Sequence, residues 1–153
     1  MGYSHYWRFK GEKAPVEFEN GAEKFTKAAQ IGARLCDKVR SMGIEICGGD
    51  GHSTPVFSEG KVVFNGCADK GESCETFSIH SNDGMWDFCK TGEKPYDLLV
   101  CLMLLAFKHF FGDDFEYSSD GFNKVGFGPE RVDNGWVKAY EVWREVKKER
   151  GLK

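Results

Sequence analysis

FCKTGEKPYDLLVCLMLLAFKHFFG, residues 88–112, joins a polar, cationic loop to the most apolar stretch of the chain. Pro95 suits the first turn of a helix, because its missing N–H costs nothing there, and Gly112 supplies a stop. The residues at 98–111 are apolar nearly all round, so we expect a helix that is buried on every side. The rest of the fold must therefore pack around this central helix.

The segments on either side have the patterns of strands and of amphipathic helices. Residues 3–9 alternate between two sets of side chains, which is typical of a strand with one covered face. Residues 20–42 repeat apolar side chains at helical spacing between an Asn20 cap and Gly43, and residues 134–150 form a last helix. Further short strands are expected at 44–47, 56–57, 61–65, 75–80, 85–88 and 115–118. This order predicts an α+β fold, a mainly antiparallel sheet with about three helices, of which one is buried and central.

Length and charge narrow the class of protein. With 153 residues and 41% hydrophobic content, the chain is expected to form a single globular domain over 1–153. A formal charge of −3 argues against general binding of nucleic acid or anionic lipid, since both need a basic surface. The N-terminus lacks the apolar core of a signal peptide, and the apolar run 98–107 is shorter than the ~20 residues that cross a bilayer. We therefore expect a cytoplasmic protein without a membrane partner, and a homo-oligomer stays open.

The six cysteines show no regular spacing. None are paired as C-x-x-C, and Cys36 and Cys101 fall at apolar helix positions, where a reduced thiol packs as a small hydrophobe. We expect no disulfide framework, no metal and no cofactor. The alternative is a zinc site, which would draw its ligands from Cys47, Cys67, Cys74, Cys89 and either His52 or His80.

The loop before the central helix predicts an anion site. Lys90, Thr91 and Lys94 lie where free backbone N–H groups and the positive end of the helix dipole meet, an arrangement that favours phosphate. Ser119 and Asp120, in the turn signal SSDG, offer hydroxyl and carboxylate groups that suit a ribose. The alternative for both segments is an ordinary solvated turn.

The N-terminal strand carries more aromatic side chains than one buried face needs. Alternation places Tyr3, His5 and Trp7 on one face and Tyr6 and Arg8 on the other. If the first face is core, Tyr6 is free to stack on a base and Arg8 to contact a phosphate. We expect His5 to be a packed, hydrogen-bonded core residue, with a role as general base or metal ligand as the alternative.

Support for catalysis is weaker. The chain contains no nucleophile-elbow, zincin, P-loop or dinucleotide motif. Asp50 and His52, in the glycine-rich loop 48–55, are the best pair for acid/base or metal-assisted hydrolysis. A third function, binding of a host protein, would use the aromatic stripe of the last helix: Trp136, Tyr140 and Trp143.

Several motifs together resemble one family. MGYSHYW, PVFSEGKVVFNG, CETF, DFCKTGEKPYDLLVC and SSDG are similar to segments of uncharacterised small proteins of bacteria and their phages, which typically begin MGYTHYW. The chain departs from that pattern at Ser4, where the family has Thr, and at residues 92–93, Gly-Glu in place of Ala-Arg. The resemblance implies no defined activity. Its phage members suggest a role in countering host defence by sequestering a nucleotide-derived immune signal.

These observations predict a small-ligand-binding protein for a phosphate-bearing, nucleotide-like molecule. Lys90, Thr91 and Lys94 would hold the phosphate, an N-terminal aromatic the base, and Ser119 or Asp120 the ribose. A hydrolase that degrades such a nucleotide is the first alternative, and a host-protein interaction module is the second.

Overall fold

The computed structural model describes residues 2–124 and 130–152. Its helices are α1 (Gly21–Ser41), α2 (Asp97–Phe111) and α3 (Asn134–Arg150). Its strands are β1 (Ser4–Phe9), β2 (Val56–Phe57), β3 (Lys61–Phe64), β4 (Phe77–His80), β5 (Asp87–Lys90), β6 (Phe115–Ser119), β7 (Phe122–Lys124) and β8 (Glu130–Val132).

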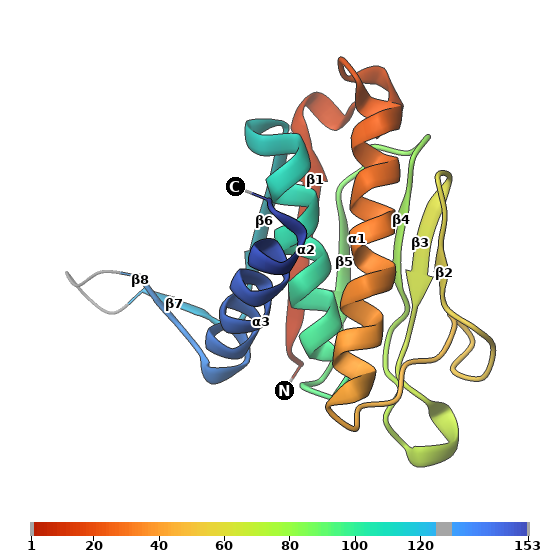
Figure 1. Ribbon diagram of the computed structural model, residues 1–153. Coiled ribbons are helices and arrows are strands. Elements are labelled where there is room, and N and C mark those ends of the chain that lie inside the picture. Colours follow the sequence, from red (N-terminus) through yellow and green to blue (C-terminus); the bar gives the residue numbers. More distant parts are fainter. Residues whose placement is uncertain (1, 125–129, 153) are drawn as a thin grey trace.

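Two three-stranded antiparallel sheets lie edge to edge, in the orders β2-β3-β4 and β5-β1-β6. They meet where the Glu75 N–H donates to the Lys90 carbonyl oxygen at 3.0 Å. β1 is the middle strand of the second sheet, so its alternate residues point to opposite faces of that sheet. A two-stranded ribbon of β7 and β8 projects to one side (Figure 1).

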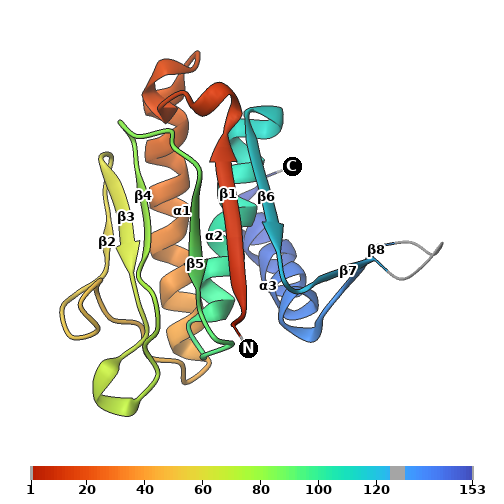
Figure 2. The ribbon, with the colours of Figure 1, turned by 180° about the vertical axis from the view of Figure 1, so that it is seen from behind.

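The helices α1, α2 and α3 all cover the same face of the sheets and leave the opposite face open (Figure 2). α2 lies between α1 and α3, and the side chains of residues 99–107 are all buried. α1 approaches α2 closely at Gly32, where a Cβ atom would come within 2.7 Å of the Met103 Sδ atom. The predicted α+β fold with a buried central helix is therefore confirmed, and the buried apolar side chains of the three helices and of both three-stranded sheets belong to one hydrophobic cluster.

The predicted elements differ from the observed ones mainly at the sheet edges. Residues 44–47 form no strand but one isolated bridge between Cys47 and Asn65. The strand expected at 85–88 is β5, two residues later, and the ribbon of β7 and β8 was not predicted. Short edge strands are decided by pairing partners that a local pattern does not reveal.

The cysteine prediction was wrong in one respect. Cys47 and Cys67 form a disulfide, with Cα atoms 5.2 Å apart and a sequence separation of 20. The pairing between Cys47 and Asn65 brings the two thiols together, which spacing along the chain cannot show. Disulfides are typical of oxidising compartments, so the cytoplasmic location stays a prediction.

A helix must be both long and apolar to cross a membrane. Across the described ranges, none of the helices combines the length and the apolar character that a membrane span requires.

Candidate functional site on the open face of the sheet

Three aromatic rings gather on the open face of the β5-β1-β6 sheet. We call Tyr6, Trp86 and Phe88 the aromatic platform. The Tyr6 ring stacks on Trp86 with centroids 6.2 Å apart and planes at 20°, and the Trp86 and Phe88 centroids are 5.5 Å apart. Trp86 is 51% exposed and Phe88 44% exposed. A shallow hollow of about 230 Å³ lies beside Tyr6 and Trp86 and reaches to Glu116 and Ser118.

The sheet register explains why these rings meet. Tyr6 is directly opposite Phe88 on β5 and opposite Ser118 on β6. Directly paired side chains on one face of an antiparallel sheet lie within about 5.5 Å of each other at Cβ, so contact follows from the register. Trp86 precedes β5 by one residue and shares the face of Phe88 by alternation. The platform is thus built by β1, β5 and the residue that directly precedes β5.

Cationic side chains flank the platform along the strand direction. Lys90 pairs with Ser4, two residues before Tyr6 on the same face of β1. Arg8 lies on that face two residues after Tyr6, in the opposite direction along the strand. Two residues of strand span roughly 7 Å, so each cation lies within reach of a ligand that stacks on Tyr6. Arg8 also binds the Glu116 carboxylate at 2.9 Å, but both side chains are more than half exposed and such a pair is weak.

Asp120 lies at the same end of the face as Lys90. Its Oδ2 accepts the Ser4 N–H at 3.0 Å, and its Oδ1 accepts the Tyr6 hydroxyl at 3.4 Å. The carboxylate therefore holds the end of β1 and touches the aromatic platform. Of the predicted ligand-binding residues, the structure brings Tyr6, Arg8, Lys90 and Asp120 to one face.

Thr91 does not reach this face. Its side chain is fully buried, and its hydroxyl donates to Asp97 Oδ1 at 2.5 Å. The amides expected to bind an anion are also occupied, since the N–H groups of Thr91 and Gly92 both donate to the Tyr3 carbonyl oxygen. Asp97 itself occupies the first turn of α2. Thr91 and these two amides are thus taken up by protein partners, and the anion site expected at this helix start stays a prediction.

Two other predicted residues lie apart from the platform. Ser119 is buried, and its hydroxyl accepts the indole N–H of Trp136 at 2.9 Å, so it faces the core and not a ribose. The step of one residue from Ser118 to Ser119 turns the side chain to the covered face of β6. Lys94 is exposed in the turn that leads to α2, beyond the end of β5.

Beneath the sheet lies a buried polar cluster around His5. The His5 Nε2 atom is 2.6 Å from Asp97 Oδ1, and Cys101 Sγ is 3.8 Å from the same nitrogen. His5 is fully buried and its Nδ1 atom has no hydrogen-bond partner among the described residues. This confirms that His5 is a packed, hydrogen-bonded residue. Burial and the nearby Asp97 carboxylate raise the pKa of the Cys101 thiol well above its ordinary value, which keeps it a neutral, unreactive group.

The His5 cluster also has the donor types of a metal site. One ligand atom from each of His5, Asp97 and Cys101 lies within 4.8 Å of the others. Nitrogen, oxygen and sulfur donors together suit a zinc ion. The direct contact between His5 and Asp97 accounts for their geometry without an ion, since a buried imidazole and a carboxylate satisfy one another.

The cysteine-rich zinc site considered from the sequence does not form within residues 2–124 and 130–152. Cys47 and Cys67 are joined to each other, which removes both as thiolate ligands. Burial raises the pKa of the Cys89 thiol far above its usual range, and its Sγ donates to the Glu75 carbonyl oxygen.

Asp50 and His52 lie in the loop before β2, at the far end of the strand order from the platform. The Asp50 carboxylate accepts hydrogen bonds from the Ser53 N–H, the His52 N–H and the Ser53 hydroxyl. These bonds lower its pKa to about 2, so it is a poor proton acceptor near neutral pH. The His52 ring lies 3.5 Å from Asp69 instead. The carboxylate stabilises a turn, and the pair does not form an acid/base couple.

The aromatic stripe of α3 faces the core. Trp136 is fully buried against Tyr117 and Phe122, with ring centroids 5.6 Å and 4.8 Å away, and Trp143 is 8% exposed. The surface imagined for a host protein is therefore not present at these tryptophans. The same helical spacing describes a core stripe and an interface stripe, so the sequence could not separate them.

Trp86 and Phe88 are the residues of this face that sequence reasoning missed. The strand expected at 85–88 already placed both on one side by alternation, but their partner was not known. Only the pairing of β5 with β1 puts them beside Tyr6. Comparison of the chain with models of known protein families, with curated proteins and with solved structures found no match.

Proposed function

We propose that this protein binds a planar, negatively charged small molecule of nucleotide type on the open face of its sheet. The base would stack on the aromatic platform, and the phosphate would lie toward Lys90 or Arg8. One observation carries the proposal: three partly exposed aromatic rings in mutual contact, with a cation on either side along β1. Stacking a base on such a side chain contributes about 1 to 3 kcal/mol.

Asp120 would fix the orientation of the ligand. Its carboxylate touches the Tyr6 hydroxyl and lies at the end of the platform nearest Ser4. A carboxylate at that place accepts hydrogen bonds from ribose hydroxyls, as it does in nucleotide-binding folds. Thr91 and Ser119 do not belong to the proposed site, because both hydroxyls form hydrogen bonds inside the core.

Binding without turnover is the form of the proposal that the chemistry favours. The Asp50 carboxylate is committed to its own loop, and the Cys101 thiol is buried and neutral. The resemblance to bacterial and phage proteins supports the further step that the protein sequesters its ligand from a host signalling pathway. A hydrolase would need one of the two carboxylates beside the platform as its base: Asp120, which accepts hydrogen bonds from the Ser4 N–H and the Tyr6 hydroxyl, or Glu116, which contacts Arg8.

The test is incubation of the protein with a panel of mononucleotides and cyclic oligonucleotides, followed by isothermal titration of those that bind. After heat denaturation of the protein, mass spectrometry should find the released ligand chemically unchanged. Tyr6→Ala and Trp86→Ala should each weaken binding by about 1 to 3 kcal/mol. Val137→Ala, which removes an exposed apolar side chain from α3, is the control and should leave affinity unchanged. Full affinity in both platform variants would contradict the proposal, and a converted ligand would favour the hydrolase.

A further inference from the structure

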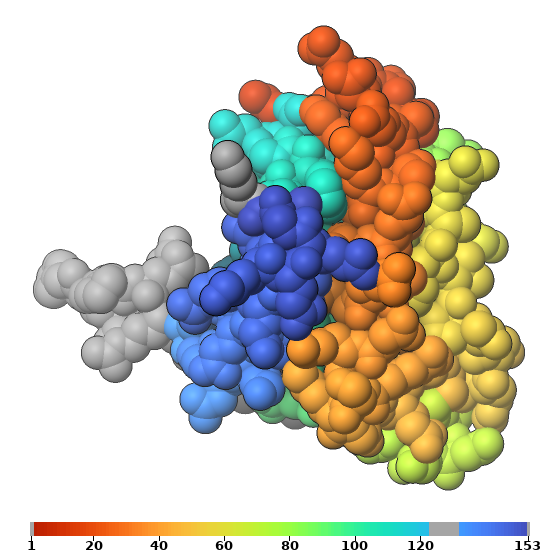
Figure 3. Space-filling model, in the orientation of Figure 1, coloured from red at the N-terminus to blue at the C-terminus, as the bar shows by residue number. Residues whose placement is uncertain are grey.

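A second cavity lies on the other side of the molecule, over the helices. It measures about 720 Å³ and is lined by α1, by Phe57 of β2, by Phe110 of α2 and by the C-terminal end of the chain. In Figure 3 that end, in dark blue, reaches across to α1, in orange. We call this cavity the helix-face groove. Its volume is typical of sites that bind small molecules.

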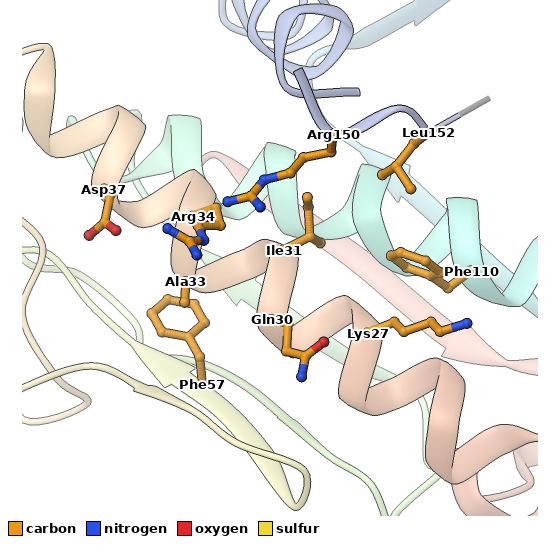
Figure 4. A pocket seen from close by; sticks show the side chains of 10 residues that line it. All are labelled: Lys27, Gln30, Ile31, Ala33, Arg34, Asp37, Phe57, Phe110, Arg150 and Leu152. Atoms are coloured by element: carbon orange, nitrogen blue, oxygen red, sulfur yellow. The ribbon is translucent and has the colours of Figure 1, made fainter. Parts of the chain in front are cut away.

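The charged side chains of the groove are unbalanced. Arg34 of α1 and Arg150 of α3 extend toward one another in Figure 4, and both line the groove. Lys27 adds a third cation, while Asp37 is the carboxylate that lines it. In the part of the chain that the structure describes, neither Arg34 nor Arg150 has a carboxylate within ion-pair distance. Two guanidinium groups that face each other favour an anion between them.

Apart from Gln30 and the charged side chains named above, the side chains that line the groove are apolar. Ile31 lies beside the two arginines, and Phe110 and Leu152 lie beyond it on one side (Figure 4). These three side chains come from α1, α2 and the segment after α3. The chain as a whole carries a charge of −3, so the cations here are a local feature and not part of a basic surface. A cationic end next to an apolar wall matches a ligand with one charged and one apolar end.

We propose that the helix-face groove binds an amphiphilic organic anion. Its carboxylate or phosphate group lies between Arg34 and Arg150, and its apolar body lies along Ile31 toward Phe110 and Leu152. A guanidinium binds either oxyanion with two parallel N–H donors, which is why both head groups belong to the same ligand chemistry. The groove and the aromatic platform lie on opposite faces of the molecule, so each can fail without the other.

The experiment titrates the full chain with four probes and follows amide chemical shifts by NMR. The probes are octanoate, octyl phosphate, neutral octanol and inorganic phosphate, all below micelle-forming concentrations. The two amphiphilic anions should give saturable shifts at Ile31 and Arg34, and the tighter of them identifies the head group. Octanol lacks the charge and inorganic phosphate lacks the apolar body, so each should bind at least tenfold more weakly.

Variants at the two arginines test the assignment directly. Arg34→Gln and Arg150→Gln should each weaken the tighter anion at least tenfold and leave the melting temperature nearly unchanged, because neither side chain holds the fold together. Arg144→Gln is the matched control, since it removes one positive charge from α3 outside the groove. Equal affinity for octanol, unchanged affinity in both variants, or no shift at Ile31 with either anion would overturn the proposal.

Discussion

The two faces of β1 differ in how far their side chains are exposed to water. His5, Trp7 and Phe9 point toward α2 and are all nearly inaccessible to water, whereas Tyr6 and Arg8 point away from the helices. Both faces are rich in aromatic rings. The inner rings contact side chains from helices and strands, such as Phe77, Phe107 and Trp136, while the outer Tyr6 contacts Trp86 and Phe88.

The two faces differ in how much of their side-chain surface remains in contact with water. His5, Trp7 and Phe9 on the inner face have exchanged nearly all contact with water for packing and for the His5–Asp97 contact. The outer face keeps half of Trp86 and nearly half of Phe88 in solvent, with polar groups around them. Partly exposed rings flanked by charges are a poor way to stabilise a fold and a good way to hold a planar ligand. We expect substitutions on the inner face to change stability and those on the outer face to change binding.

The largest effect is expected at Trp7. Trp7→Ala removes a ring that is 4% exposed and packs 5.0 Å from the Phe77 centroid, so the free energy of unfolding should fall by about 3 to 5 kcal/mol. Urea unfolding measures the change. Tyr6→Ala, one residue earlier, is the matched comparison and should cost far less stability. Equal losses at the two positions would break the distinction between the faces.

Thr91→Val tests whether Thr91 stabilises the buried side of the sheet or binds the ligand. The substitution removes the hydroxyl that donates to the buried Asp97 carboxylate, so unfolding should become easier by about 1 to 3 kcal/mol. Nucleotide affinity should stay the same, because Thr91 is inside the protein. A large loss of affinity with intact stability would restore Thr91 as a phosphate ligand.

Alkaline pH should weaken the inner face. Burial raises the pKa of the Cys89 thiol far above its usual range, whereas the thiol ionises near pH ~8.5 in the unfolded chain. The folded state therefore keeps a proton that the unfolded state loses. Its stabilising effect is complete below pH ~8.5 and decreases by about 1.4 kcal/mol for each pH unit above that.

Urea unfolding between pH 7.5 and 10.5 measures this slope. Cys89→Ala should remove the contribution of one titrating group, about 1.4 kcal/mol per pH unit, from this slope. The substitution also lowers stability at every pH. Tyr96, whose pKa burial likewise raises, adds its own loss above pH ~10 in both proteins. An identical slope in the variant and the parent would show that the Cys89 thiol does not contribute.

The smallest change concerns Lys90. Lys90→Glu replaces a cation at the edge of the platform by an anion, so affinity for a phosphate-bearing nucleotide should fall at least tenfold, about 1.4 kcal/mol. The melting temperature should hardly move, because the Lys90 side chain is exposed. Lys61→Glu, on β3 of the other sheet, makes the same charge change and should leave affinity unaltered. Comparable losses of affinity in both variants would show that the net charge of the protein, and not a contact with Lys90, causes the effect.

The local patterns were sufficient for the helices and for the strand β1. The apolar run from Leu98, with Pro95 before it and Gly112 after it, determines α2, because only a buried helix accommodates such a segment. Alternation along β1 determines that Tyr6 and Trp7 face opposite ways, since the period of a strand is two residues. These features depend on neighbours in the chain and so can be read from it.

Contacts between distant segments were decided only by the tertiary structure. The pairing of β5 with β1 sets Phe88 beside Tyr6, the bridge at Asn65 brings Cys47 to Cys67, and the end of α3 brings Arg150 to Arg34. At the start of α2, Thr91 and Asp97 satisfy each other, so the amides and dipole that suggested an anion site are already used. A sequence shows which groups are able to bind one another. Which of them meet depends on how the core packs, because burial forces each polar group to take the nearest available partner.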